Sequence, residues 1–297
     1  MRKVGTLRLI SWNVMGGYGG RMADQVEAMG ERKPDIVALQ EVTAKLAPVY
    51  REHLQRQGLY SIIDSFQFAM YMTRLRGQSY GEMIASKWPL ITSPVHFEVP
   101  WPEKVLSCYL ISPWGDIQVH TAHVPKSKNN DVRKIQTLEG IYKGLAIKSQ
   151  YPRILCGDLG TPQEETADGV VITWGQKHKR SGEITLQPYW GLKWDTWERN
   201  ILQGLEKFDL TDTYRTVNGP GQRDFSFYEV ESGRRSGRRY DHVFASGSLN
   251  PTECRYLHSF RERRMSEHSP IETVFDPIIS QTDPSQLVSF PVGRRDL

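Results

Sequence analysis

Four segments of the sequence place chemistry-bearing side chains at the ends of apolar runs. Asn13 ends ISWN, Glu41 ends DIVALQE and Asp158 ends RILCGD, while Glu267 and His268 stand in SEH just before another apolar run. Carboxylates are costly to bury without a partner. A single charged residue at the end of an apolar run often marks only where a strand leaves the core. Four such places in one chain indicate a convergent site.

The composition is that of a globular chain. It has 297 residues, of which 38% are hydrophobic, and a mean hydropathy of −0.51. No apolar run reaches the length needed to span a bilayer. Arg8 interrupts the first apolar stretch, so residues 7–14 predict a strand rather than a signal peptide. We therefore expect a cytoplasmic protein with no membrane association, in which Cys108, Cys156 and Cys254 are buried free thiols.

The basic residues are clustered although the formal net charge is only +4. Lys and Arg neutralise backbone phosphates, so such clusters would suit a polyanionic substrate. Basic clusters are also common on ordinary solvated surfaces. The clusters are Lys177, Lys179 and Arg180; Arg234, Arg235, Arg238 and Arg239; and Arg261, Arg263 and Arg264.

Hydrophobic periodicity predicts the elements that would position the candidate residues. We expect strands at 7–14, 36–41, 60–64, 81–86, 104–111, 117–124, 153–158, 224–230, 239–246, 253–259 and 271–275. We expect helices at 22–29, from a Thr43 cap to Gly58, at about 130–148 and at 194–207, with 160–192 irregular. Strands that follow one another with few helices between them favour a layered α/β sandwich over a Rossmann-like parallel sheet.

An ordered set of motifs resembles the endonuclease/exonuclease/phosphatase superfamily. The motifs lie between residues 7 and 275 and are LRLISWNV, PDIVALQEV, GEMIASKWPL, VHTAHVP, RILCGDLGTP, DTYR, RRYDHVFAS and SEHSP. The resemblance implies a four-layer α/β sandwich, with two packed mixed β-sheets flanked by helices and one site at the sheet edges. It also implies a single domain over 1–275, followed by a polar C-terminal tail over 276–297.

The same resemblance implies a divalent-metal site. Glu41 matches the family's metal-ligating glutamate, and Asn13 matches the asparagine that helps to hold the metal or its waters. Glu267 occupies the position of another metal-ligating carboxylate. Mg²⁺, or Mn²⁺ in its place, is the implied ion, because hard cations prefer oxygen ligands.

The resemblance also implies four catalytic roles besides that of Asn13. Asp158 would orient or deprotonate the attacking water, or protonate the leaving oxygen. His268 would contact the scissile phosphate, Asp241 would pair with His268, and His123 would be a second catalytic histidine. Such a carboxylate–histidine pair fixes the imidazole and stabilises its cationic form.

Other polar residues near these motifs are assigned from strand alternation and charge. His120 and His242 should point to the opposite sheet face from His123 and Asp241, and we expect a structural role for His242. We also predict substrate contacts from Arg238, Arg239 and Lys126, although the two arginines are equally compatible with a solvated surface.

Two positions depart from the family pattern. Gly160 replaces the asparagine of GDxN and removes one preorganised hydrogen-bond donor, a loss of about 2.7–4 kcal/mol elsewhere. Glu267 replaces an aspartate, which adds a methylene and changes the reach of the carboxylate. These changes predict weakened or retuned activity rather than an inactive protein.

The sequence leaves three functional hypotheses open. The first is a divalent-metal-dependent nuclease acting on DNA or RNA, which the basic clusters favour. The second is a phosphodiesterase or phosphatase acting on a small-molecule or lipid phosphate. The third is a non-catalytic nucleic-acid-binding relative that lost activity through Gly160. The stretch VMGGYGGR after Asn13 lacks the Asn-Gly-x-Arg pattern of abasic-site endonucleases, and the sequence indicates no protein partner.

Overall fold

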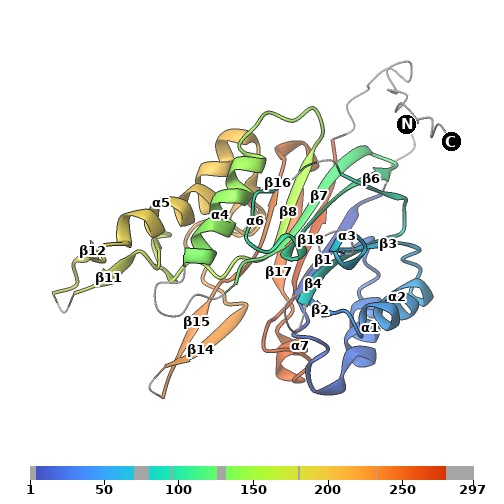
Figure 1. Cartoon of the computed structure of the whole chain (residues 1–297), viewed down its shortest axis with the longest axis horizontal. Helices are drawn as coiled ribbons and strands as arrows, with labels where there is room; N and C mark the ends of the chain where they lie inside the picture. Colours follow the sequence, from blue (N-terminus) through green and yellow to red (C-terminus); the bar gives the residue numbers. More distant parts are fainter. Residues whose placement is uncertain are drawn as a thin grey trace.

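Two mixed β-sheets pack face to face in the computed structural model of the chain (Figure 1). The structure describes residues 5–69, 80–93, 95, 97–125, 132–179, 181–231 and 233–278. Lys126 and most of the expected tail, 279–297, lie outside the described residues. The layer between the sheets is apolar, with Leu9, Ile84, Val119 and Val243 among its buried members.

The first sheet unites the two ends of the described chain. Its strand order is β17–β18–β1–β2–β4–β3, with β1 parallel to β2 and antiparallel to β18. The strands are β1 (Leu7–Asn13), β2 (Ile36–Thr43), β3 (Ser61–Asp64), β4 (Tyr80–Ser86), β17 (Pro251–Tyr256) and β18 (Ile271–Phe275).

The second sheet sets the register of three candidate site residues. Its strand order is β13–β16–β8–β7–β6–β5. Asp158 lies opposite His123 on parallel β7 and opposite Asp241 on antiparallel β16. The strands are β5 (Leu90–Thr92), β6 (Val105–Ser112), β7 (Gly115–His123), β8 (Arg153–Asp158), β13 (Thr211–Asp212) and β16 (Asp241–Ala245).

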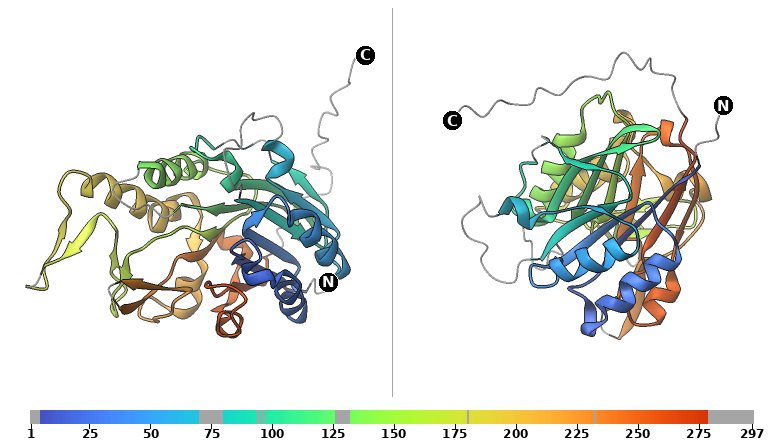
Figure 2. Two further views of the ribbon diagram at one scale, coloured as in Figure 1. Left: turned by 60° about the horizontal axis from the view of Figure 1, so that its bottom comes forward. Right: turned by 90° about the vertical axis from the view of Figure 1, so that its right-hand side faces the viewer.

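Helices cover the outer face of each sheet (Figure 2). On the first sheet, α1 (Met22–Glu31), α2 (Ala47–Arg56) and α7 (His258–Glu262) pack around Trp12 and Leu39. On the second sheet, α4 (Val132–Leu145) and α5 (Gly191–Leu202) pack around Leu155 and Phe244. The four longer helices each present an apolar stripe to their sheet, as amphipathic helices do, and α7 contributes Phe260. The four layers follow from these two cores and the one between the sheets.

Short elements extend from the sandwich. Two hairpins, β11–β12 and β14–β15, project away from its body (Figure 1). The hairpin strands are β9 (Glu164–Glu165), β10 (Val171–Ile172), β11 (Gln176–His178), β12 (Ile184–Leu186), β14 (Phe227–Glu231) and β15 (Arg234–Arg238). The remaining helices are α3 (Phe66–Ala69), α6 (Thr213–Asn218), η1 (Tyr18–Gly20), η2 (Pro102–Lys104), η3 (Gly204–Phe208) and η4 (Gly247–Leu249).

The predicted fold class is confirmed, and the differences lie in local detail. Thr43 ends β2 instead of capping a helix, although its hydroxyl accepts a hydrogen bond from the backbone N–H of Leu46. The region 160–192 contains the short strands β9 to β12 instead of being irregular throughout. The expected helix 194–207 begins at Gly191 and ends at Leu202, followed by η3, while β15 and α7 were not expected.

Two further features of the described chain concern its cysteines and its helices. The three cysteines are buried free thiols, as expected. Within the residues that the structure describes, every helix is too short or too polar to cross a lipid bilayer.

Candidate active site

The side-chain amide of Asn13 joins two carboxylates that come from different sheets. Its Nδ2 donates to Glu41 Oε1 at 3.0 Å and to Asp158 Oδ2 at 2.9 Å. Its Oδ1 accepts from the backbone N–H of Met15 at 3.0 Å. Asn13 and Asp158 are buried, and the Glu41 side chain is about 20% exposed. The amide donor therefore holds two carboxylates close together, one of them partly exposed to solvent.

A backbone irregularity aims Glu41 at this point. The pairing of β2 with β4 shifts register between Leu39 and Val42, and Glu41 has a φ of +56°. A bulge redirects one side chain, and a non-glycine residue at positive φ stores strain of about 1–3 kcal/mol. The Glu41 carbonyl accepts a hydrogen bond from Gly16 N at 2.8 Å, which helps to hold the conformation.

Gly157 allows β7 and β8 to approach closely beside Asp158. Its φ is +134°, and a Cβ built there would lie 2.0 Å from the backbone oxygen of Ala122. Because no side chain fits, a glycine is required before Asp158. The close approach places Asp158 next to His123 in the parallel register.

His268 lies between two of the candidate carboxylates. Its Nδ1 is 2.8 Å from Asp241 Oδ2, and its Nε2 is 3.7 Å from Asp158 Oδ2. The ring packs on Phe227, with centroids 4.7 Å apart, and the His268 carbonyl accepts from Trp12 Nε1 at 2.9 Å. The Asp241 carboxylate accepts a hydrogen bond from the His268 Nδ1–H, and Nε2 faces the site.

His123 has its tautomer set by a lysine that the sequence analysis did not single out. Lys104 Nζ lies 3.1 Å from His123 Nδ1, and His123 Nε2 lies 3.2 Å from Glu41 Oε1. An ammonium group donates hydrogen bonds and accepts none, so Nδ1 is the acceptor and Nε2 carries the proton. In this arrangement His123 presents an N–H donor toward Glu41.

Glu82 on β4 is a second residue that the sequence analysis missed. It is fully buried, and its Oε2 accepts from Thr121 Oγ1 at 3.5 Å. Burial raises the pKa of Glu82 well above its ordinary value; Lys104 lowers it, whereas the Glu41 and Asp158 carboxylates raise it further. The signal was a glutamate inside the apolar run GEMIAS, where a charge requires partners.

The donor set fits a hard divalent cation. Ligand atoms of Glu41, His123 and Asp158 lie within 4.8 Å of one another, and so do those of Asp158, Asp241 and His268. Because His123 Nε2 carries a proton, this nitrogen cannot bind a cation. Glu41 and Asp158 are therefore the oxygen donors of the first group. Mg²⁺ commonly uses one or two carboxylates and retains waters, so two are sufficient.

The other two predicted metal ligands, Asn13 and Glu267, differ in where they lie. The Asn13 oxygen accepts a hydrogen bond from Met15 N, and its Nδ2 positions the two carboxylates; direct ligation by Asn13 stays a prediction. Glu267 is exposed and belongs to neither candidate ligand group among the described residues. Its backbone N–H contacts Met15 Sδ at 3.4 Å.

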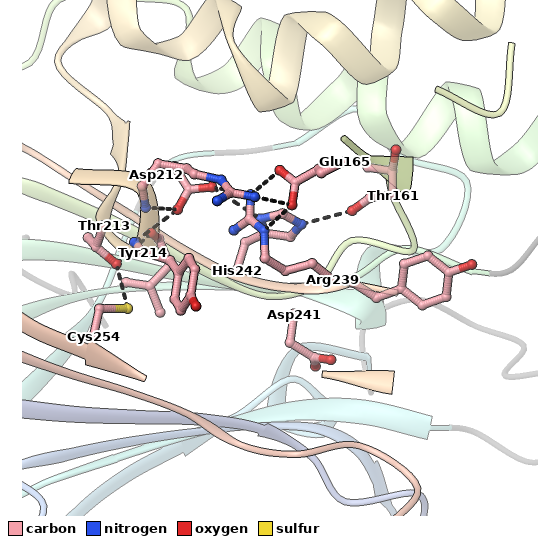
Figure 3. Close-up of polar contacts among 12 residues, drawn as sticks. Thr161, Glu165, Asp212, Thr213, Tyr214, Arg239, Asp241, His242 and Cys254 are labelled. Carbon is pink, nitrogen blue, oxygen red and sulfur yellow. Dashed lines mark hydrogen bonds and ion pairs between the residues drawn. The ribbon is translucent and has the colours of Figure 1, made fainter. Parts of the chain in front are cut away.

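The predicted substrate arginines are engaged by carboxylates or carbonyls. Arg239 is 4% exposed, with Nε 2.7 Å from Glu165 and Nη2 2.7 Å from Asp212 (Figure 3). Arg238 pairs with Glu229 at 3.2 Å. Arg239 is thus held in a buried ion-pair network, which favours a structural role, and its substrate contact stays a prediction.

Strand alternation separates His120 and His242 from the site. Figure 3 shows the His242 and Asp241 side chains pointing to opposite sides of β16. His242 is buried, with Nε2 2.8 Å from the Thr161 carbonyl oxygen. His120 is also buried, and burial lowers its pKa to about 3, with a smaller contribution from Arg153. His120 therefore stays neutral at physiological pH and has a structural role.

The site lies at one edge of a two-sheet sandwich and combines carboxylates, an amide and two histidines that contact the carboxylates. This combination defines the class of protein, a phosphoesterase scaffold. The model of the Endonuclease/Exonuclease/phosphatase family matches residues 10–268, and the chain belongs to that family. The resemblance drawn from the sequence motifs is thereby confirmed.

Several solved structures share the fold. An AP endonuclease from Archaeoglobus fulgidus matches with a TM-score of 0.66 and 21% identity, covering 91% of this chain and 99% of that one. An endonuclease/exonuclease/phosphatase from Beutenbergia cavernae matches with a TM-score of 0.59 and 18% identity, covering 91% and 71%. TDP2 from D. rerio, complexed with a single-strand DNA product, matches with a TM-score of 0.58 and 14% identity, covering 91% and 99%.

Proposed function

We propose that the protein is a divalent-metal-dependent phosphodiester hydrolase that acts as a nuclease on DNA or RNA. The observation that carries the proposal is the meeting of Glu41, Asp158 and Asn13 with His123 and His268. These residues come from four strands and the segment before β18. Phosphodiester hydrolysis needs charge stabilisation on the non-bridging oxygens, an aligned water and help for the leaving oxygen. This set of groups offers all three.

Each side chain has a separate task in the proposed reaction. Asp158 orients the attacking water and accepts its proton. His268, oriented by Asp241 and in its cationic form, donates a hydrogen bond from Nε2 to a phosphoryl oxygen. His123 donates a hydrogen bond from Nε2 to the leaving oxygen. A Mg²⁺ or Mn²⁺ ion held by Glu41, with Asp158 beside it, would neutralise negative charge that develops on the phosphoryl oxygens.

A basic arm beside the site supports a polyanionic substrate. The β14–β15 hairpin leads directly into β16, the strand that begins with Asp241. Arg234 and Arg235 on this hairpin are exposed, and the Arg235 guanidinium lies 3.8 Å from the centre of the Tyr228 ring. Exposed arginine and aromatic groups are the contacts that bind nucleic-acid phosphates and bases. The similar structures named for an AP endonuclease and a DNA-bound TDP2 point to the same substrate class.

A metal-dependent cleavage screen tests the proposal. The purified protein is incubated with Mg²⁺ and supercoiled plasmid, single-stranded DNA, RNA or bis-p-nitrophenyl phosphate. We expect nicking of the plasmid that stops with EDTA, and a loss of at least about a hundredfold in Asp158→Ala. A folded protein that cleaves none of these substrates with Mg²⁺ or Mn²⁺ would support the non-catalytic alternative. Cleavage of the small diester without any nucleic acid would support the small-phosphodiester alternative.

A further inference from the structure

A buried ammonium group lies behind the loop that follows Asp158. Lys134 on α4 is 3% exposed, and its Nζ donates to the Gly160 carbonyl oxygen at 2.8 Å. The same Nζ lies 3.1 Å from Glu198 Oε1 on α5. A buried charge is strongly unfavourable unless it is paired and hydrogen-bonded. Apolar residues of similar size would pack α4 equally well, so the ammonium group requires an explanation beyond packing.

Gly160 connects Lys134 to the proposed catalytic carboxylate of Asp158. The backbone N–H of Gly160 donates to Asp158 Oδ1 at 3.0 Å, while its carbonyl accepts from Lys134. Gly160 has a φ of +60°, and glycine has little conformational preference of its own. An external contact is therefore needed to hold the N–H in the direction that orients Asp158.

Glu198 contacts both Lys134 and the residue after Gly160. Its Oε2 accepts from Thr161 Oγ1 at 2.5 Å and from the backbone N–H of Trp174 at 2.9 Å. The rings of Trp174 and Trp194 have their centres 5.7 and 5.3 Å from the Lys134 Nζ. The Lys134–Glu198 ion pair thus contacts two neighbouring residues of the loop, Gly160 through Lys134 and Thr161 through Glu198.

We propose that Lys134 is a positioning residue for Asp158, acting through Gly160, and that Glu198 balances the charge of Lys134. The effect on catalysis rests on the proposed function, in which Asp158 orients and deprotonates the attacking water. The positioning of Gly160 itself does not depend on that function. Lys134 contacts the loop from the core side and is not a catalytic residue.

Three variants separate positioning from simple charge balance. Lys134→Met removes the donor to Gly160 but leaves the Glu198 charge without its partner. Lys134→Met/Glu198→Gln removes both charges, while the glutamine oxygen still accepts from Thr161 and Trp174. Glu198→Gln is the matched control, because Lys134 can still donate to Gly160.

The kinetic measurement uses bis-p-nitrophenyl phosphate with saturating Mg²⁺. We expect kcat to fall about 10–100-fold in Lys134→Met and in the double variant, with KM within threefold of the wild type and Glu198→Gln close to wild type. Recovery of wild-type kcat in the double variant would overturn the proposal, since the loss would then reflect only the unpaired Glu198. A wild-type kcat in both Lys134 variants would overturn it as well.

A second measurement reports on the loop without any turnover. Amide hydrogen exchange of Gly160, followed by NMR, should be at least about tenfold faster in both Lys134 variants than in the wild type and Glu198→Gln. Unchanged exchange would overturn the positioning of Gly160, whatever the kinetics show. A wild-type protein with no hydrolysis but with the expected exchange pattern would reject the proposed function and keep the structural role of Lys134.

Discussion

Asn13 shows how one neutral side chain can organise a charged site. Its two amide hydrogens are directed at Glu41 and Asp158, and its oxygen is fixed by the backbone N–H of Met15. Two carboxylates at this separation repel each other unless donors or a cation lie between them. The amide supplies the donors and places two carboxylates side by side, the kind of oxygen ligands that a hard cation prefers. Asn13 therefore prepares the site without adding charge to it.

Position 160 tests how much the missing asparagine costs the site. A Cβ at Gly160 would have the Val124 carbonyl oxygen at 3.4 Å, and asparagine tolerates the positive φ found there. We expect Gly160→Asn to fold normally and to raise kcat about tenfold or more, because it restores a preorganised donor. The matched control is Gly160→Ala, which has the same backbone strain but no donor. No increase for Asn over Ala, with metal bound, would contradict this account of the departure.

The carboxylate behind His268 gives a second test. Asp241→Asn keeps the shape of the side chain but removes the charge that orients the imidazole and stabilises its cation. We expect kcat to fall about a hundredfold or more. Asp224→Asn is the control, because Asp224 pairs with His258 at the same distance of 2.8 Å. Equal losses in the two variants would mean that histidine pairing matters here only for folding.

Site residues at strand ends could be predicted from the sequence, whereas those inside the fold could not. Asn13, Glu41 and Asp158 follow apolar runs, so their types and positions were legible. Lys104 and Lys134 act through contacts between elements distant in the chain, and a lysine in a helix or a loop gives no local signal. The ion pairs of Arg239 likewise depend on Glu165 and Asp212, which only the folded chain brings to it.

At the scale of elements, one glutamate connects three neighbouring strands. Glu272 on β18 lies opposite Ile10 on β1 and Arg255 on β17. Its carboxylate contacts Arg8 at 3.0 Å, Arg32 at 2.8 Å and Arg255 at 2.7 Å. The cluster therefore stabilises the register that places the SEH segment beside β1.

The pH dependence of stability tests the Glu272 cluster. Burial would raise the pKa of Glu272, but hydrogen bonds from Arg32, Arg255 and Arg8 outweigh it and lower the pKa from 4.5 to about 2. A depressed carboxylate pKa contributes stability above pH 4.5, and that contribution is lost as the pH falls toward 2. We expect Glu272→Gln to reduce the free energy of unfolding by about 1.5–3 kcal/mol at pH 7.

Urea denaturation between pH 7 and pH 2.5 measures this difference. The gap between wild type and Glu272→Gln should shrink steadily below pH 4.5. Glu253→Gln is the control, because Glu253 also contacts Arg255 but both side chains are about half exposed, so its effect should be small. A gap that stays constant with pH would show that the charge of Glu272 is not the stabilising feature.

The predictability of elements follows their periodicity. Strands such as β1, β8 and β18 lie close to their predicted bounds because they are short apolar runs with clear ends. The short strands β9 to β12 have too few residues for a pattern to be detected. The helix α7 follows β17 with no Gly or Pro between them to mark the end of the strand. The sequence 253–259 was therefore interpreted as one strand.

At the scale of the whole molecule, the site depends on both ends of the chain. β1 pairs with β18 in the first sheet, and Asp158 on β8 meets Asn13 from β1 across the two sheets. We propose that residues 1–275 form one domain, because a division in the middle of the chain would separate Asn13 from His268. The sandwich thus serves to bring strand ends together from sequence positions more than 250 residues apart, as in the hydrogen bond from Ser266 to the Asn13 carbonyl oxygen.

The dependence of hydrolysis on free Mg²⁺ tests the central claim most directly. The rate with bis-p-nitrophenyl phosphate is measured over a Mg²⁺ titration from a chelated baseline for the wild type, Glu41→Gln and the surface control Glu52→Gln. We expect the wild type and the control to rise from zero to the same plateau, and Glu41→Gln to need at least about tenfold more Mg²⁺ for half of its maximal rate. A wild-type rate independent of Mg²⁺, or a Glu41→Gln titration identical to the wild type, would contradict the assignment of Glu41 and Asp158 to a shared cation.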